Sequence, residues 1–73
     1  MKKPTMTPQN ADVLDFMQRN GAITSMDAFE KLNITRLSAR IWDLIHLGYK
    51  IVWTDKTKKE NGRVIRWREY RLA

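Results

Sequence analysis

Arginine and lysine are the residues of this sequence whose types and spacing suit a chemical task, and that task is binding an anion. Arg36 and Arg40 are four residues apart, so a helix would bring both to one side. A guanidinium forms paired hydrogen bonds with phosphate oxygens, and a lysine ammonium binds phosphate as a point charge. A second cationic group follows: Lys56, Lys58, Lys59, Arg63, Arg66 and Arg68. The two groups together indicate a polyanionic partner.

The net charge of +6 lies entirely in the C-terminal half of the chain. Residues 1–35 hold four basic and four acidic side chains, whereas residues 36–73 hold ten basic and four acidic ones. Such an asymmetry favours nucleic acid as the partner, with an anionic membrane surface second. Small soluble proteins are also often basic without binding either, so charge alone leaves these readings open.

The residue inventory argues against an enzyme. There is no cysteine and only one histidine, which excludes thiolate zinc sites, thiol nucleophiles and disulfide bonds. The sequence has no paired serine and histidine, no glycine-rich phosphate loop and no acidic cluster suited to a metal. We therefore expect no catalysis, no metal and no cofactor, and a small binding module instead.

Length and hydropathy predict one domain in the cytoplasm. A chain of 73 residues allows a single domain, which we place over residues 7–73 after a leader over residues 1–6. The longest apolar run is residues 51–53, far too short to span a membrane. No apolar stretch follows the basic start of the chain, so a signal peptide is not expected.

The N-terminal half predicts two short helices. Thr7 as N-cap, with proline after it, begins a helix over residues 8–20, and Gly21 ends it. Residues 22–24 form a short extended link. A second helix, capped by Thr24 or Ser25, runs to about residue 32. Its inward candidates are Ala28, Phe29 and Leu32.

A third helix is predicted over residues 36–47, with Thr35 as its N-cap and Gly48 at its end. Its apolar residues recur at helical spacing and predict a buried stripe: Leu37, Ile41, Leu44 and Ile45. Its other side carries mostly polar residues: Arg36, Ser38, Ala39, Arg40, Trp42, Asp43 and His46.

After the third helix the apolar period changes to two, which predicts a β-hairpin. The first strand covers residues 49–54, residues 55–62 form a polar tip that ends in Asn61-Gly62, and the second strand covers residues 63–72. Which side of the second strand faces the core stays open, because Tyr70 and Leu72 lie on one side of it and Ile65 and Trp67 on the other, so a bulge or a strand buried on both sides is possible.

Each tryptophan has an expected place. Trp53 is in phase with Ile51 and is predicted in the core. Trp67 is expected to pack across the hairpin from Val52 or Trp53. Trp42 lies off the apolar stripe of its helix, so it is either at the rim of the core beneath the hairpin, which we favour, or exposed beside the arginines, where it would mark a protein interface.

The segment ITRLSARIWDL at residues 34–44, with Gly48-Tyr49 and the final Tyr70-Arg71-Leu72, resembles the small winged helix-turn-helix domains common in phage and plasmid proteins. The resemblance covers residues 8–72. It implies an α+β fold of three helices followed by a two-stranded β-hairpin wing, with the third helix as the recognition element. Winged helices also serve as protein-interaction modules, so the resemblance is more specific for the fold than for the function.

Double-stranded DNA is the partner that the resemblance implies. The third helix would enter the major groove, where Arg36 and Arg40 would read guanine. Other contacts are expected from Thr35 and Ser38 to phosphate and from Ala39 to a thymine methyl. Asp43 would accept from a cytosine amine or hold Arg40 or Arg36 in place.

The wing, residues 55–63, would grip the DNA backbone or the minor groove. Its expected contacts, with one residue further along the strand, are Lys56, Lys58, Lys59, Arg63 and Arg66. The same cations would also protect an exposed sheet edge from aggregation.

These expectations predict a phage or mobile-element transcriptional regulator, or an excisionase-like accessory factor, acting as a homodimer or a cooperative array. The alternative is an interaction module that binds and inhibits a host protein. RNA binding ranks last, because the aromatic residues are expected in packing.

Overall fold

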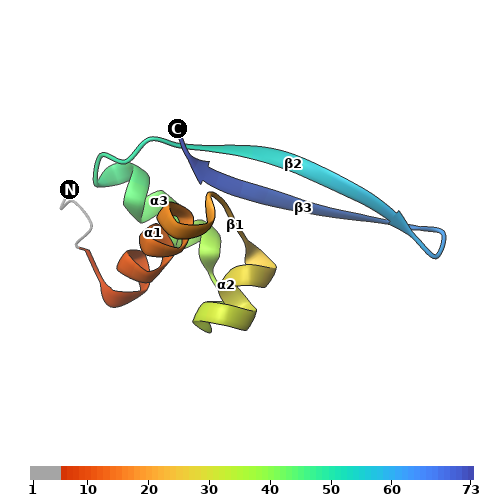
Figure 1. Cartoon of the computed structure of the whole chain (residues 1–73), viewed down its shortest axis with the longest axis horizontal. Coiled ribbons are helices and arrows are strands. Elements are labelled where there is room, and N and C mark those ends of the chain that lie inside the picture. Colours follow the sequence, from red (N-terminus) through yellow and green to blue (C-terminus); the bar gives the residue numbers. More distant parts are fainter. Residues whose placement is uncertain (1–5) are drawn as a thin grey trace.

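The computed structural model describes residues 6–73, with the helices at one end of the molecule and a long hairpin projecting from them (Figure 1). The elements in chain order are α1 (Pro8–Asn20), β1 (Ile23–Thr24), α2 (Ser25–Leu32), α3 (Leu37–His46), β2 (Ile51–Glu60) and β3 (Arg63–Leu72). Three helices followed by a β-hairpin confirm the predicted α+β class. Of the predicted leader, residues 1–5 lie outside the described residues. No helix within residues 6–73 is long and apolar enough to cross a membrane.

Local capping sets the ends of α1 as the sequence predicts. The Thr7 hydroxyl accepts a hydrogen bond from the Asn10 N–H at 3.2 Å, and Pro8 occupies the first turn. Gly21 ends the helix in a left-handed conformation, and its N–H donates to the Met17 carbonyl at 2.8 Å.

A capping box begins α2. The Thr24 hydroxyl accepts from the Asp27 N–H at 3.2 Å, and the Asp27 carboxylate accepts from the Thr24 N–H at 3.1 Å. The expectation that Phe29 points inward was wrong, since it is 56% exposed while its neighbour Ala28 is fully buried. A helix this short turns only one narrow side to the core, and the small residue occupies it. Asn33 then turns the chain in a left-handed conformation.

The start of α3 differs from the prediction. The helix begins at Leu37, its N-cap is Arg36, and no side chain caps it, so the assignment of Thr35 as N-cap was wrong. Arg36 has a non-helical backbone (φ −119°, ψ 63°), which delays the helix by one residue. Leu37, Ile41 and Leu44 are buried as predicted.

Ile45 is the exception in the predicted stripe, because 40% of its surface is exposed. It follows Leu44 at about 100° round the helix, which takes it off the packed side. The sequence period therefore identified the buried stripe but made it one residue too wide.

β2 and β3 form a continuous antiparallel ladder from Ile51↔Leu72 to Glu60↔Arg63. The predicted polar tip over residues 55–62 was wrong, since only Asn61 and Gly62 lie outside the strands. Both have positive φ angles, 49° and 77°, as in the type I′ turns that match the twist of paired strands. The pairing therefore continues to the tip.

The sheet order is β1-β3-β2, with β1 paired to β3 through Ile23↔Tyr70 and Thr24↔Glu69. Directly opposed residues share a face, and the face with Ile51, Tyr70 and Ile23 is buried against the helices. This settles the inward phase of β3 in favour of Tyr70 and Leu72, in an unbroken register.

Two tryptophan predictions for the hairpin were wrong. Trp53 shares the inward face of the sheet and is directly opposite the buried Tyr70, but it is 49% exposed, because it lies on the edge strand β2 while the helices pack mainly against β3. Its ring lies 6.3 Å from that of Tyr70. Trp67 is opposite Lys56 in the register and not opposite Val52 or Trp53.

The core lies at the root of the hairpin, between the three helices and the sheet. It contains Val13, Met17, Ile23, Ala28, Ile34, Leu37, Ile41, Leu44, Ile51 and Tyr70. The outer hairpin extends well past this core, in a molecule measuring 45 × 25 × 22 Å (Figure 1). The fold thus presents two exposed features, the outer side of α3 and a projecting two-stranded wing.

Candidate nucleic-acid interface

The start of α3 carries several of the residues that the sequence predicts to contact DNA. Arg36 and Ser38 are exposed, Ala39 is half-buried, and Thr35 is exposed in the turn before the helix. Within residues 6–73, the Arg36 side chain has no ion pair or hydrogen bond, so its charge is uncompensated. The structure therefore brings together four of the predicted contact residues at one helix end.

Arg40 lies differently from Arg36, although it is only one turn away. Its Nη2 is 3.2 Å from the Asp43 carboxylate, and its Nη1 donates to Gln9 Oε1 of α1 at 2.9 Å. The Arg40 and Asp43 side chains are only 26% and 17% exposed. The expected Arg40–Asp43 pair is thus present, and it fixes Arg40 against α1 rather than leaving it extended into solvent.

Trp42 and His46 form a stacked pair on the outer side of α3. Their ring centroids are 3.7 Å apart with 27° between the planes, and His46 Nδ1 lies 2.9 Å from the Trp42 carbonyl oxygen. Trp42 is 52% exposed, so the expectation of packing beneath the hairpin was wrong. Sequence reasoning missed this pair, although the spacing of four residues is the signal for a contact on one helix face.

Several wing cations are held by acidic neighbours. Lys56 Nζ lies 3.6 Å from Glu69, and Lys58 Nζ lies 3.7 Å from Glu60. Arg68 Nε donates to Asp55 at 2.9 Å, and its guanidinium lies over the Trp53 ring at 5.2 Å. The hydrogen bond to Asp55 raises the pKa of Arg68.

Other wing cations are uncompensated. Among the side chains of residues 6–73, Lys59, Arg63 and Arg66 have neither an ion pair nor a side-chain hydrogen bond. Lys59 and Arg66 share the face of the hairpin that packs on the helices at its root, while Arg63 lies on the opposite face. The outer hairpin therefore presents positive charge in two directions near its tip.

Within residues 6–73 there is no group of three histidine, cysteine or acidic residues that would hold a metal ion. Hollows on the surface lie along the hairpin and beside α2.

Comparison with known proteins agrees with this geometry. A family model described as a winged helix-turn-helix domain matches residues 8–73. No curated protein and no solved structure matches the chain. The match extends from the first residue of α1 to the end of the wing, and winged helix-turn-helix domains are a DNA-binding class. The chain belongs to the winged helix-turn-helix domain family.

Proposed function

We propose that this protein is a transcriptional regulator or an excisionase-like accessory factor of a phage or mobile element, acting on double-stranded DNA in the cytoplasm. In this proposal α3 enters the major groove and the hairpin follows the backbone or the minor groove. The observation that carries it is the placement of uncompensated charge. Among the cations of residues 6–73 that have no ion pair or side-chain hydrogen bond, Lys31 of α2 lies over the Phe16 ring. The others lie at the start of α3, along the hairpin and just before it: Arg36, Lys50, Lys59, Arg63 and Arg66.

The roles on α3 follow from the exposure of each side chain. Arg36 reads a base or binds a phosphate, because it is exposed and has no partner among residues 6–73. Ser38 and Thr35 donate to phosphate, and Ala39 leaves space for close approach to a thymine methyl. Arg40 contacts the DNA only at the edge of the same groove, because Asp43 holds its guanidinium.

On the wing, Lys59, Arg63 and Arg66 are the phosphate contacts. Lys56 and Lys58 are secondary contacts, since a phosphate must compete with Glu69 and Glu60 for them. Each strand has ten residues and so spans about 33 Å, close to the length of one turn of B-DNA. A wing of this length can contact phosphates well outside the groove that α3 enters.

Affinity sets the expected assembly. A single module of this size buries roughly 600–1,000 Å² of protein surface on DNA. We therefore propose that a homodimer or a cooperative array on repeated sites supplies the affinity that a regulator needs.

The test is fluorescence anisotropy with a duplex library at several salt concentrations, followed by sequencing of the retained fraction. With Arg36 on a phosphate beside Lys59, Arg63 and Arg66, four phosphate contacts give log K against log salt a slope of about −3.6. Replacing Lys59 or Arg63 by glutamine should flatten the slope by about 0.9 each and weaken all sequences alike. The matched control is Arg19→Gln, which removes the same charge from the outer side of α1, where Arg19 pairs with Asp15 at 3.1 Å. A slope that these wing substitutions leave unchanged contradicts the proposal.

The second candidate is an interaction module that binds and inhibits a host protein. It is favoured by the exposed apolar side chains of α3, Trp42 and Ile45. Binding to the library that disappears at physiological salt and enriches no motif would support this candidate over the regulator.

A further inference from the structure

The β3 strand has an open edge beside α2. β1 pairs with β3 only at Tyr70 and Glu69, because the chain leaves the sheet at Ser25 to form α2. Beyond Glu69 toward the tip, no strand of residues 6–73 lies on this side of β3. The segment Arg63–Arg68 is therefore paired with β2 only, and its other edge faces solvent.

The register identifies the backbone groups on that edge. In antiparallel strands, the N–H and C=O of successive residues point to opposite edges. Glu60 and Arg63 close a two-residue turn, so Arg63 faces β2, and Val64, Arg66 and Arg68 face away from it. Tyr70 continues this alternation and faces Ile23 of β1. The three residues thus present unpaired donors and acceptors in line with β1, which is a template for another strand.

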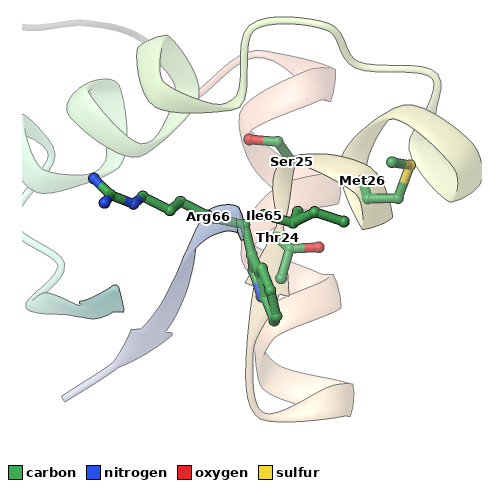
Figure 2. A pocket seen from close by; sticks show the side chains of 6 residues that line it. Thr24, Ser25, Met26, Ile65 and Arg66 are labelled. Atoms are coloured by element: carbon green, nitrogen blue, oxygen red, sulfur yellow. The ribbon is translucent and has the colours of Figure 1, made fainter. Parts of the chain in front are cut away.

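A hollow of about 340 Å³ lies against the same edge. Its lining joins the start of α2 to β3: Thr24, Ser25, Met26, Ile65, Arg66 and Trp67. Figure 2 shows Ile65 extending toward Met26, while the Arg66 side chain leaves in the opposite direction. Met26 and Ile65 are both largely exposed. The edge therefore has an apolar recess on one face of the sheet and a cation on the other.

We propose that this edge binds an extended segment of a partner protein by strand addition. The segment alternates apolar and acidic residues. One apolar side chain fills the recess between Met26 and Ile65, and an acidic side chain on the other face meets the Arg66 guanidinium, which has no partner within residues 6–73. Main-chain hydrogen bonds to Arg66 and Arg68 supply the pairing. This surface is separate from the outer side of α3 but shares Arg66 with the proposed phosphate contacts of the wing, so the inference adds a protein partner to the proposed DNA binding.

Charge selects another protein over a second copy of this chain. Two β3 edges paired antiparallel would place the arginines of one copy against those of the other: Arg63, Arg66 and Arg68. The β2 edge is also basic, with Lys56, Lys58 and Lys59 against Asp55 and Glu60. Neither strand of this hairpin complements the open edge, whereas an acidic strand does.

The experiment uses the whole chain and a short synthetic peptide of alternating glutamate and valine. A peptide with lysine in place of glutamate is the control. Binding is followed by amide chemical shifts in ¹⁵N-labelled protein. We expect the acidic peptide to shift the amides of Val64, Arg66, Arg68 and Met26, and the basic peptide to leave them unchanged. Equal binding of both peptides, or shifts confined to β2 or α3, overturns the proposal.

Matched proline substitutions test the backbone contact. Arg66→Pro removes an N–H from the open edge without touching the ladder to β2, and Thr57→Pro does the same on the outer edge of β2, directly across from it. Circular dichroism verifies that both variants fold. Arg66→Pro should lower the affinity for the acidic peptide by about tenfold or more, whereas Thr57→Pro should leave this affinity unchanged. Arg66→Gln removes the charge but keeps the backbone N–H, so it should lose less affinity for the peptide than Arg66→Pro. A Thr57→Pro variant that loses as much as Arg66→Pro overturns the assignment to β3.

The recess is tested separately by Met26→Ser, a residue outside the proposed DNA contacts. This variant should bind the peptide several-fold more weakly, and the salt dependence of its DNA binding should stay unchanged. Self-association that shifts the same amides without peptide would assign the edge to a second copy and overturn the proposal. Shifts of these amides by duplex DNA alone, with no peptide binding, would overturn it as well.

Discussion

Arg40 of α3 donates a hydrogen bond to Gln9 of α1 across 2.9 Å. The same guanidinium lies 3.2 Å from Asp43, so one side chain links two helices and its own next turn. Its Nε is buried without a hydrogen-bond partner among residues 6–73, which shows how far the group is drawn toward α1. A residue held this way contributes to the packing of α1 on α3 before it contributes to binding.

Arg40→Ala should therefore lower the free energy of unfolding by about 1–2 kcal/mol, because it removes a partly buried pair and leaves Asp43 without its partner. The measurement is urea denaturation followed by circular dichroism. A double-mutant cycle with Asp43→Ala isolates the pair. Unchanged stability in Arg40→Ala, together with a lost base preference, would instead make Arg40 a direct reader of bases.

Arg36→Ala should show the opposite behaviour. Its side chain is exposed and makes no contact that stabilises the fold, so the unfolding free energy should stay within about 0.5 kcal/mol of the parent. On a selected DNA site the variant should lose about 1–3 kcal/mol and accept other bases at one position. Competition binding with single-base variants of that site is the measurement. Retained preference at every position would remove Arg36 from the reading face.

Thr24→Ala should cost about 1 kcal/mol of stability, since it removes the hydroxyl half of the capping box with Asp27. Thr35→Ala is the matched control. It is the same substitution just before the next helix, where no side chain caps. The melting temperature of Thr24→Ala should lie a few degrees below that of Thr35→Ala. Equal losses would mean that Thr35 stabilises the start of α3 by a route absent from this structure.

Ile41→Ala should cost about 2–5 kcal/mol, because Ile41 is buried in the core. Ile45→Ala changes the same side chain one turn later, at a position that is 40% exposed, and should cost about 1 kcal/mol or less. Chemical denaturation measures both values. DNA binding should fall in Ile41→Ala only in proportion to the unfolded fraction.

Gly62→Ala tests the turn of the wing. Gly62 has φ +77° with open space where a Cβ would lie, so the cost is backbone strain alone, about 1–2 kcal/mol. Since the tip lies far from the core, this strain should speed amide exchange near the tip and leave the helices protected. Gly21→Ala, at φ +87° in the cap of α1, should instead lower protection throughout. If Gly62→Ala lowered amide protection equally in the wing and the helices, the wing and the helical body would unfold as one unit.

Much of the fold could be predicted because local signals determine it. Thr7, Pro8 and Gly21 set the ends of α1 through contacts within one helical turn. Asn61-Gly62 set the turn of the hairpin in the same way. The buried residues Leu37, Ile41 and Leu44 followed from helical period alone.

The errors fall where a residue's surroundings depend on distant parts of the chain. Trp53 has the right phase for burial, but burial needs a helix above it, and the helices pack mainly against β3 rather than against the edge strand β2. Phe29 has the right hydrophobicity, but α2 offers the core only a narrow side. Residues 55–60 are polar, yet they pair because the turn at their end fixes the register.

The candidate site divides in the same way. The sequence could identify the cations of α3 and the wing, because their types and order in the chain are local facts. It left open whether Asp43 pairs with Arg40 or with Arg36, and it gave no signal for Gln9 on another helix, which also holds Arg40. It also missed the open edge of β3, which exists only because β1 is short.

The positions of the tryptophans have an optical consequence. Trp42 and Trp53 are about half exposed and Trp67 is half-buried, so all three indoles already meet water in the folded chain. Intrinsic emission should therefore shift little when the protein unfolds, and it is a poor measure of stability here. The same indoles lie on α3 and along the hairpin, where a ligand would cover them. Their fluorescence reports what docks on the molecule rather than whether the molecule is folded.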